Sequence, residues 1–229
     1  MLEFQHVTKK QGKFVLKDIN FQLEEGYLLG IVGKNGAGKS TLMRCMLEEK
    51  ADYVGEIFFQ GENIRQNRRK FMEQTAYIAD DNIFLKGKTL RQNVEILESF
   101  YPEFSMEQFQ WDMQAMKLST GKILGNLSRG EFIRFQLAFA RARNARLYLL
   151  DEATAGMDPV FRKDFYGILR EILATEATVI MTTHVQSDIN KNMDYVCRLE
   201  EGRMVYYQEN FGDMDTTGRV LEGKLERKV

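Results

Sequence analysis

The chain is organised around the stretch Gly33-Lys34-Asn35-Gly36-Ala37-Gly38-Lys39-Ser40 and the Thr41 that follows it. This stretch matches the phosphate-binding loop pattern G-x-x-x-x-G-K-[ST] at every fixed position. The apolar run before it (28–32) is typical of a short strand, and the pattern after it (41–47) is typical of a helix. Backbone N–H groups of such a loop, with the positive end of the following helix, bind phosphate oxygens. The stretch therefore predicts a site for a nucleoside triphosphate.

Two side chains of the loop have chemistry of their own. Lys39 supplies a mobile cation for the β- and γ-phosphates, and the Ser40 hydroxyl can ligate Mg²⁺. A chance glycine-rich turn is the alternative interpretation. The flanking strand and helix argue against it, because a phosphate-binding loop requires that context.

Composition limits the class of protein. At 229 residues the chain suits one large domain, or one domain with a sizeable insertion. Its 44% hydrophobic and 28% charged residues are ordinary for a soluble globular protein. The net charge of −1, with no basic patch among aromatics, predicts no nucleic-acid partner. No run approaches the ~18 apolar residues of a membrane span and no signal peptide is recognisable, so a cytosolic chain is expected. The few histidines and cysteines exclude a zinc site, and Cys45 and Cys197 are expected to be buried free thiols.

Strand patterns surround the loop in the first third of the chain. Alternating apolar residues predict strands over 2–7 and 14–23, and a further short strand is predicted over 55–61. A short apolar segment at 77–79 ends in Asp80. This part is expected to form a β-rich flank of the nucleotide site.

Helical patterns replace the strands from about residue 82 to 145. Thr89 is expected to cap a helix over 90–101, and Ser105 with Gln108 forms a capping-box pattern for a helix reaching about residue 118. The second helix carries an apolar stripe of Phe109, Met113 and Met116. Such a stripe is usually core, and a groove that docks a partner is the alternative.

The last helix of this section begins at the sequence Leu127-Ser128-Arg129-Gly130-Glu131 and is predicted to reach about residue 143. Ser128 and Glu131 again form a capping box, so a purely structural interpretation is available.

The continuous apolar run 147–150 ends in Asp151 and Glu152, as expected for a strand buried on both faces of a parallel sheet. A helix capped by Asp158 and a second buried strand over 177–183 follow. His184 stands at the carboxyl end of that strand. A terminal hairpin is predicted over 195–207, and residues 209–229 carry no readable function.

Three separate segments are thus expected at one edge of the sheet, where ligands bind in α/β folds: the phosphate loop, Asp151 with Glu152, and His184. Asp151 can hold Mg²⁺ through water. Glu152 can polarise a water for in-line attack on the γ-phosphorus, and His184 can donate to a γ-phosphate oxygen. As a lone residue His184 is more often structural, but its place at a strand end favours the functional interpretation.

The order of these motifs resembles the ATP-binding subunit of an ABC (ATP-binding cassette) transporter over about residues 1–208. The matching motifs are the phosphate loop, a helical insertion, LSRGE, LYLLDEA, AGMD and a histidine after a strand. In wording and length the chain is most similar to cassettes of drug, peptide or bacteriocin exporters. The resemblance implies a P-loop NTPase (RecA-like) α/β core with a mixed sheet, an antiparallel N-terminal β flank and an inserted helical subdomain. It divides a single ATP-binding domain into a core (1–81 and 146–208), a helical subdomain (82–145) and a tail (209–229).

The resemblance also implies partners and cofactors. They are ATP, Mg²⁺, a second ATP-binding subunit (identical or different) and a polytopic membrane subunit, with this chain peripheral on the inner face of the cell membrane. The family's signature motif corresponds to 127–131, so Ser128 and Gly130 are expected to contact the ATP held by the other subunit. The start of a helix also favours an anion.

Several residues depart from the family pattern. Gln11 replaces the aromatic residue that usually stacks on adenine, and Phe14 is the candidate substitute; losing a stacking partner weakens base binding by about 1–3 kcal/mol. Asp80 replaces the usual glutamine and could ligate Mg²⁺ directly. Arg129 and Glu131 replace a glycine and a glutamine in the signature. These departures motivate an alternative, a regulatory cassette that hydrolyses ATP poorly, and a non-transport ABC ATPase is a further one.

Overall fold

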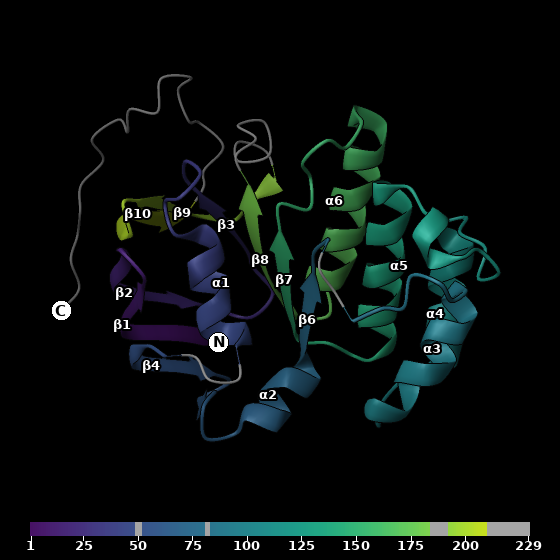
Figure 1. The fold of residues 1–229 in the computed structure, drawn as a ribbon, viewed down its shortest axis with the longest axis horizontal. Coiled ribbons are helices and arrows are strands. Elements are labelled where there is room, and N and C mark those ends of the chain that lie inside the picture. Colours follow the sequence, from purple (N-terminus) through teal and green to yellow (C-terminus); the bar gives the residue numbers. More distant parts are fainter. Residues whose placement is uncertain (49–51, 81–82, 184–191, 210–229) are drawn as a thin grey trace.

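A pair of β-sheets forms the frame of the fold (Figure 1) in the computed structural model, which describes residues 1–48, 52–80, 83–183 and 192–209. The strands are β1 (Leu2–Gln11), β2 (Phe14–Leu23), β3 (Leu28–Val32), β4 (Val54–Phe59), β5 (Glu62–Asn63), β6 (Thr75–Ile78), β7 (Leu147–Asp151), β8 (Thr178–Thr183), β9 (Tyr195–Glu200) and β10 (Arg203–Glu209). The helices are α1 (Lys39–Leu47), α2 (Arg68–Gln74), α3 (Leu90–Leu97), α4 (Met106–Ala115), α5 (Arg129–Ala142) and α6 (Pro159–Leu173), with 3-10 turns η1 (Glu98–Phe100) and η2 (Leu124–Asn126).

The smaller sheet is antiparallel, with order β2-β1-β4-β5. The larger has order β10-β9-β3-β8-β7-β6; its strands β9, β3, β8, β7 and β6 run parallel, and β10 is antiparallel to β9. The predicted mixed sheet and antiparallel N-terminal flank are therefore confirmed. Since β3, β6, β7 and β8 are parallel, their carboxyl ends meet at one edge.

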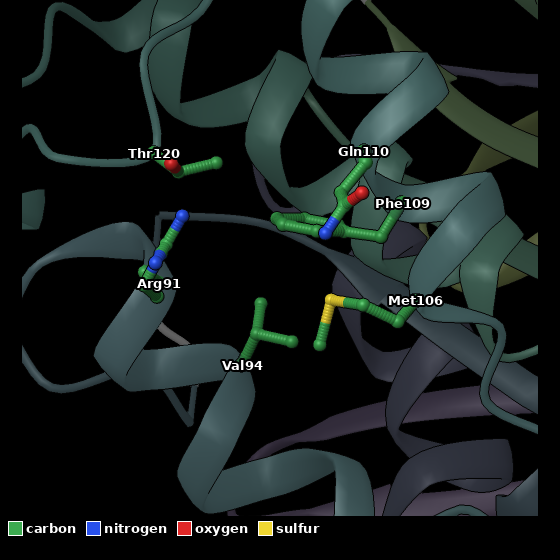
Figure 2. Close-up of a pocket in the computed structure, with 6 residues that line it drawn as sticks. All are labelled: Arg91, Val94, Met106, Phe109, Gln110 and Thr120. Atoms are coloured by element: carbon green, nitrogen blue, oxygen red, sulfur yellow. The ribbon is translucent and has the colours of Figure 1, made fainter.

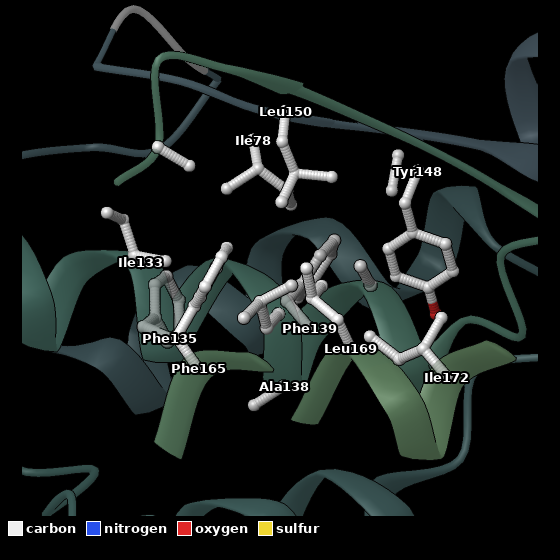
Figure 3. Packing of buried hydrophobic residues seen from close by; sticks show 14 of the residues in the cluster. Ile78, Ile133, Phe135, Ala138, Phe139, Tyr148, Leu150, Phe165, Leu169 and Ile172 are labelled. Carbon is white, nitrogen blue, oxygen red and sulfur yellow. The ribbon is translucent and has the colours of Figure 1, made fainter. Parts of the chain in front are cut away.

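Strand β7 shows how the larger sheet divides the core. Leu147 and Leu149 join a cluster that contains α1 and the antiparallel sheet, whereas Tyr148 and Leu150 join a cluster that contains α5 and α6. Figure 3 shows Tyr148 and Leu150 facing side chains of these two helices. Alternate residues of one strand thus pack on opposite faces, each leucine worth about 1.5–3 kcal/mol of burial. The predicted two-sided burial of this strand is confirmed.

Between β6 and β7 the named elements are helical, and Figure 1 shows α3 and α4 on the far side of α5 from the strands. Phe109, Met113 and Met116 are buried in the cluster that α4 shares with α5, which confirms the core interpretation of this stripe. Aromatic rings fill the junction, with Phe109 and Phe135 edge to face at 6.1 Å. The predicted boundaries of the helical subdomain stay a prediction.

The predicted helix starts are largely right. Thr89 and Ser128 each form the complete capping box, and the Asp158 side chain caps α6 by accepting from the backbone N–H groups of Val160 and Phe161. At α4 only half of the predicted box forms. Ser105 accepts from the backbone N–H of Gln108, whereas the Gln108 side chain donates to Asp112 at 3.1 Å.

Two helix ends come earlier than predicted. The helix predicted over 90–101 ends at Leu97 and continues as the 3-10 turn η1. Helix α4 ends at Ala115 because Lys117 adopts a left-handed φ of 54°. The N–H groups of Lys117 and Leu118 then bond to the carbonyls of Gln114 and Met113, the Schellman pattern that closes a helix.

Cys45 and Cys197 are buried free thiols, as expected, and burial raises the pKa of each to about 12. Across the ranges that the structure describes, no helix combines the length and apolar character of a membrane span.

Candidate nucleotide site

The phosphate loop joins β3 to α1, and at two of its positions neighbouring atoms leave no room for a side chain. A Cβ on Gly33 would lie 2.5 Å from the Leu199 carbonyl oxygen, inside any real contact distance. Gly38 has φ +114°, and a Cβ there would lie 2.9 Å from Cζ of Phe14. Gly36 also has a positive φ, +81°, with open space beside it. Side chains at Gly33 and Gly38 would therefore collide with their neighbours, whereas Gly36 is favoured by its backbone conformation alone.

The start of α1 offers N–H groups without a side-chain cap. Its N-cap is Gly38, which makes no capping bond, whereas side chains cap the starts of α3, α4, α5 and α6. The first N–H groups of a helix have no partner within the helix, so here they are available to an anion. Lys34, Asn35, Gly36 and Ser40 are exposed beside them, while Ala37, Lys39 and Thr41 are buried.

The Lys39 ammonium group is held over the loop. Its side chain is only 6% exposed, and Nζ donates to the carbonyl oxygen of Gly33 at 2.8 Å. The same nitrogen lies 3.9 Å from Oε1 of Glu152. The structure thus brings together two residues that the sequence separates by more than a hundred positions. A bound triphosphate would compete with the carbonyl for this cation.

Asp151 and Glu152 share one hydroxyl. Thr182 Oγ1 donates to Oδ1 of Asp151 at 2.6 Å and accepts from the backbone N–H of Glu152 at 2.9 Å. The register of β7 and β8 pairs Asp151 with Thr182, which places the hydroxyl there. Glu152 has a left-handed φ of 48°, a strained conformation for a residue with a side chain. Sequence reasoning missed Thr182; the available signal was a hydroxyl at the end of an otherwise apolar buried strand.

Asp80 follows β6 at the same edge and is 71% exposed. One of its carboxylate oxygens lies 3.3 Å from Nε of Arg129. In the described part of the chain no group of three or more His, Cys, Asp and Glu side chains forms a metal cluster. The oxygen donors of Ser40, Asp80 and Asp151 fit Mg²⁺, which takes few protein ligands and completes its shell with phosphates and water.

Ser128 and Gly130 lie at the start of α5. Ser128 caps the helix and exchanges hydrogen bonds with Glu131, whose other carboxylate oxygen pairs with Lys122. These bonds, that of Lys122 first, lower the pKa of Glu131. A Cβ on Gly130 would lie 2.9 Å from the ring of Phe161, so glycine allows α5 to approach α6 closely. The proposed contact of Ser128 and Gly130 with a second nucleotide stays a prediction.

Gln11 lies against the loop helix, where its Oε1 accepts from the Thr41 hydroxyl at 3.1 Å. The half-buried ring of Phe14 packs on Gly38 and faces Gly202. Phe14 therefore supports the phosphate loop, and its role in stacking on a base stays a prediction. His184 lies outside the described residues.

A separate pocket of about 230 Å³ opens in the helical part of the chain. Figure 2 shows Arg91 and Val94 of α3 facing Met106, Phe109 and Gln110 of α4. This pocket belongs to neither the phosphate loop nor the carboxylate edge. Phe109 thus serves the core and also lines a hollow, and the interpretation of that surface as a docking groove stays a prediction.

Comparisons with known proteins agree with the geometry. The sequence model of the ABC transporter family matches residues 16–155. The ABC transporter ATP-binding protein YtrB of Bacillus subtilis (strain 168) is 29% identical over 217 residues, which are 94% of this chain and 73% of YtrB. Nod factor export ATP-binding protein I of Rhizobium leguminosarum bv. viciae is 30% identical over 205 residues, 85% of this chain and 64% of that protein.

A solved structure with the same fold is a dimeric post-hydrolysis state of the ATP-binding cassette MJ0796 bound to ADP and Pi. It superposes with a TM-score of 0.78 at 20% identity and covers 93% of this chain and all of the other.

A phosphate loop at the carboxyl edge of a mixed sheet, with an acid pair on the neighbouring strand, defines a P-loop nucleotide-binding protein. The match over residues 16–155, more than half of the chain, places it further: the chain belongs to the ABC transporter family.

Proposed function

We propose that this chain is the ATP-binding and ATP-hydrolysing subunit of an ABC transporter, and that it powers export through a separate membrane subunit. The observation that carries the proposal is the distance of 3.9 Å between Nζ of Lys39 and Oε1 of Glu152. Both residues lie at the sheet edge where β3 runs into the phosphate loop. A base candidate and a phosphate-binding cation thus face the same space. The export direction rests on the wording of the LSRGE and AGMDP motifs.

Each of these residues would have a different role in hydrolysis. The loop N–H groups and Lys39 bind the β- and γ-phosphates. The Glu152 carboxylate orients a water molecule and accepts its proton, while the water oxygen bonds to the γ-phosphorus. The bond from that phosphorus to the bridging oxygen breaks, and ADP leaves. His184 donates to a γ-phosphate oxygen.

Ser40, Asp151 and Asp80 would hold Mg²⁺, which when bound neutralises charge on the β- and γ-phosphates. Thr182 donates to Oδ1 of Asp151 at 2.6 Å and the Tyr77 hydroxyl donates to Oδ2 at 3.5 Å, so both oxygens of this carboxylate are held in place.

The proposed active form is a head-to-tail pair of cassettes that encloses two ATP molecules. Ser128 and the N–H of Gly130, at the positive end of α5, would contact the ATP of the other subunit. The pair would sit on the inner face of the membrane and move the membrane subunit as it opens and closes.

The central test is Glu152→Gln in the full chain. We expect steady-state phosphate release to fall by roughly 10²–10⁴-fold, because the amide cannot accept the proton of water. Binding of Mg-ATP should persist, and light scattering should show a dimer with Mg-ATP. Lys39→Ala is the matched comparison, in which ATP binding itself should weaken. Undiminished turnover in Glu152→Gln would remove the assigned base.

A second candidate function, a cassette that binds ATP but turns it over poorly, is favoured by one observation. One carboxylate oxygen of Asp80 lies 3.3 Å from Nε of Arg129, so this cation would compete with Mg²⁺ for a proposed metal ligand. Phosphate release that stays at background in the wild-type chain and in its membrane complex, with ATP bound, would favour this second function.

A further inference from the structure

Arg129, the first residue of α5, makes three contacts outside its own helix. Nη1 donates to the carbonyl oxygen of Ala155 at 2.8 Å, and Nη2 donates to the carbonyl oxygen of Glu152 at 3.1 Å. Nε lies 3.3 Å from Oδ1 of Asp80. One guanidinium group thus joins the start of α5 to the ends of two core strands.

This cation does not stabilise the start of α5 through the helix dipole or the cap. A positive charge in the first turn opposes the helix dipole, and Ser128 with Glu131 already caps the turn. The side chain is 39% exposed, so it could have extended into solvent. Its planar fork instead matches two carbonyl oxygens at once, a geometry that lysine cannot reproduce. The contacts therefore serve the segment that Arg129 reaches.

That segment contains the strained backbone of Glu152. Its N–H is held by the Thr182 hydroxyl at 2.9 Å, and its carbonyl oxygen is held by Arg129. Both peptide groups of a residue at φ 48° are therefore fixed by side chains from different elements. A left-handed conformation in a residue with a side chain persists only when its surroundings fix it.

We propose that Arg129 is a positioning residue for the Glu152 carboxylate. By holding the Glu152 carbonyl, it keeps the carboxylate beside Lys39 and ties its direction to the position of α5. The proposal rests on the proposed function of Glu152 as the base. In the dimer, Ser128 of the same helix start would contact the partner's nucleotide, so a shift of α5 there would reach Glu152 through one side chain.

The test is steady-state ATP hydrolysis by the full chain carrying Arg129→Ala. We expect kcat to fall about tenfold, since a small misplacement of a catalytic group has effects of this size or larger. The calorimetric Kd for ATP without Mg²⁺ should stay within about twofold, because the phosphate loop is untouched and Asp80, the proposed metal ligand that Arg129 contacts, then has no cation to bind. Arg129→Lys retains the charge near Asp80 but not the planar guanidinium group. Its kcat should therefore lie between those of the wild-type chain and Arg129→Ala.

The control is Arg69→Ala. Arg69 is 89% exposed on α2 and pairs with Glu73 of the same helix, and its loss should leave kcat unchanged. A second measurement needs no turnover. Hydrogen exchange of a peptide covering residues 151–158 should speed up in Arg129→Ala, while peptides from β3 keep their rates.

A double-variant cycle separates this proposal from the proposed function. In a Glu152→Gln background, Arg129→Ala should leave the residual turnover unchanged, because it acts through the carboxylate already removed. If Glu152→Gln abolishes turnover but Arg129→Ala lowers only the melting temperature, the positioning role is overturned and the base assignment stands. If Glu152→Gln keeps wild-type turnover, the base assignment fails first. Unchanged exchange in the 151–158 peptide would also overturn the positioning role.

Discussion

At the scale of single residues, Thr182 holds Asp151 and Glu152 in place through one hydroxyl group. Its hydroxyl is both donor to Asp151 and acceptor from the Glu152 N–H, and the residue is fully buried. Removing the hydroxyl would leave the Glu152 N–H and one Asp151 carboxylate oxygen, both partly buried, without this partner, at a cost of about 1 kcal/mol. One hydroxyl therefore aligns the proposed metal-binding acid with the proposed base.

We expect Thr182→Val to lower kcat for ATP hydrolysis by about tenfold, since both carboxylates lose their alignment. Thr182→Ser retains the hydroxyl and should keep most of the rate. Stopped-flow or steady-state phosphate release measures both. Equal rates in the valine and serine variants would show that the hydroxyl has no part in alignment.

At the scale of elements, α5 combines packing with the site. Gly130 in its first turn lets Phe161 of α6 approach, and the guanidinium of Arg134 lies 4.3 Å above the same ring. The helix start that carries Ser128 is thereby fixed against α6. Its position is set by contact between the two helices as well as by its cap.

Gly130→Ala should destabilise the chain by about 1–3 kcal/mol, because the new methyl group would meet the buried ring of Phe161. Gly167→Ala in α6 is the matched control. Nothing lies within 4 Å of a Cβ at that position, so alanine there should stabilise by about 0.5–1 kcal/mol. Urea denaturation of both variants gives the comparison. A Gly130→Ala variant as stable as Gly167→Ala would contradict the close packing.

The sequence predicted elements whose signals are local. Strand β2 begins and ends at the predicted residues, and the Thr89 box caps α3. Helix α2 was missed because only Phe71 in it is buried, which leaves no apolar period to detect. The Arg129 contacts were also missed, since two of their acceptors are backbone carbonyls. Every residue has a backbone carbonyl, so the sequence does not show which of them will lie near Arg129; only the fold brings these two there.

At the scale of the whole molecule, the larger sheet separates two apolar clusters, and both cysteines lie in the one that holds α1. Burial raises the pKa of each thiol from 9.0 to about 12 in the folded chain. Above pH 9 the unfolded chain therefore holds fewer protons than the folded one. The contribution of the two thiols to the free energy of unfolding is fully present below that pH and is lost as the pH rises toward 12.

We expect the free energy of unfolding to fall between pH 8.5 and 10, by up to about 1.4 kcal/mol per pH unit for each thiol once it ionises in the unfolded chain. Urea denaturation over this range measures the slope. Cys197→Ala removes one thiol and should give a shallower slope. An identical slope in that variant would show that the thiol is not the titrating group.

The terminal hairpin reaches back to the phosphate loop through its turn. The N–H of Gly202 donates to the Ala37 carbonyl at 3.0 Å, and its own carbonyl accepts from Lys17 at 2.7 Å. Any larger residue at this turn would drive a carbon atom to 2.0 Å from the Val15 oxygen. In a saturation library selected for growth, position 202 should therefore tolerate replacement as poorly as the glycines that surround the phosphates, although it is remote from them in the sequence.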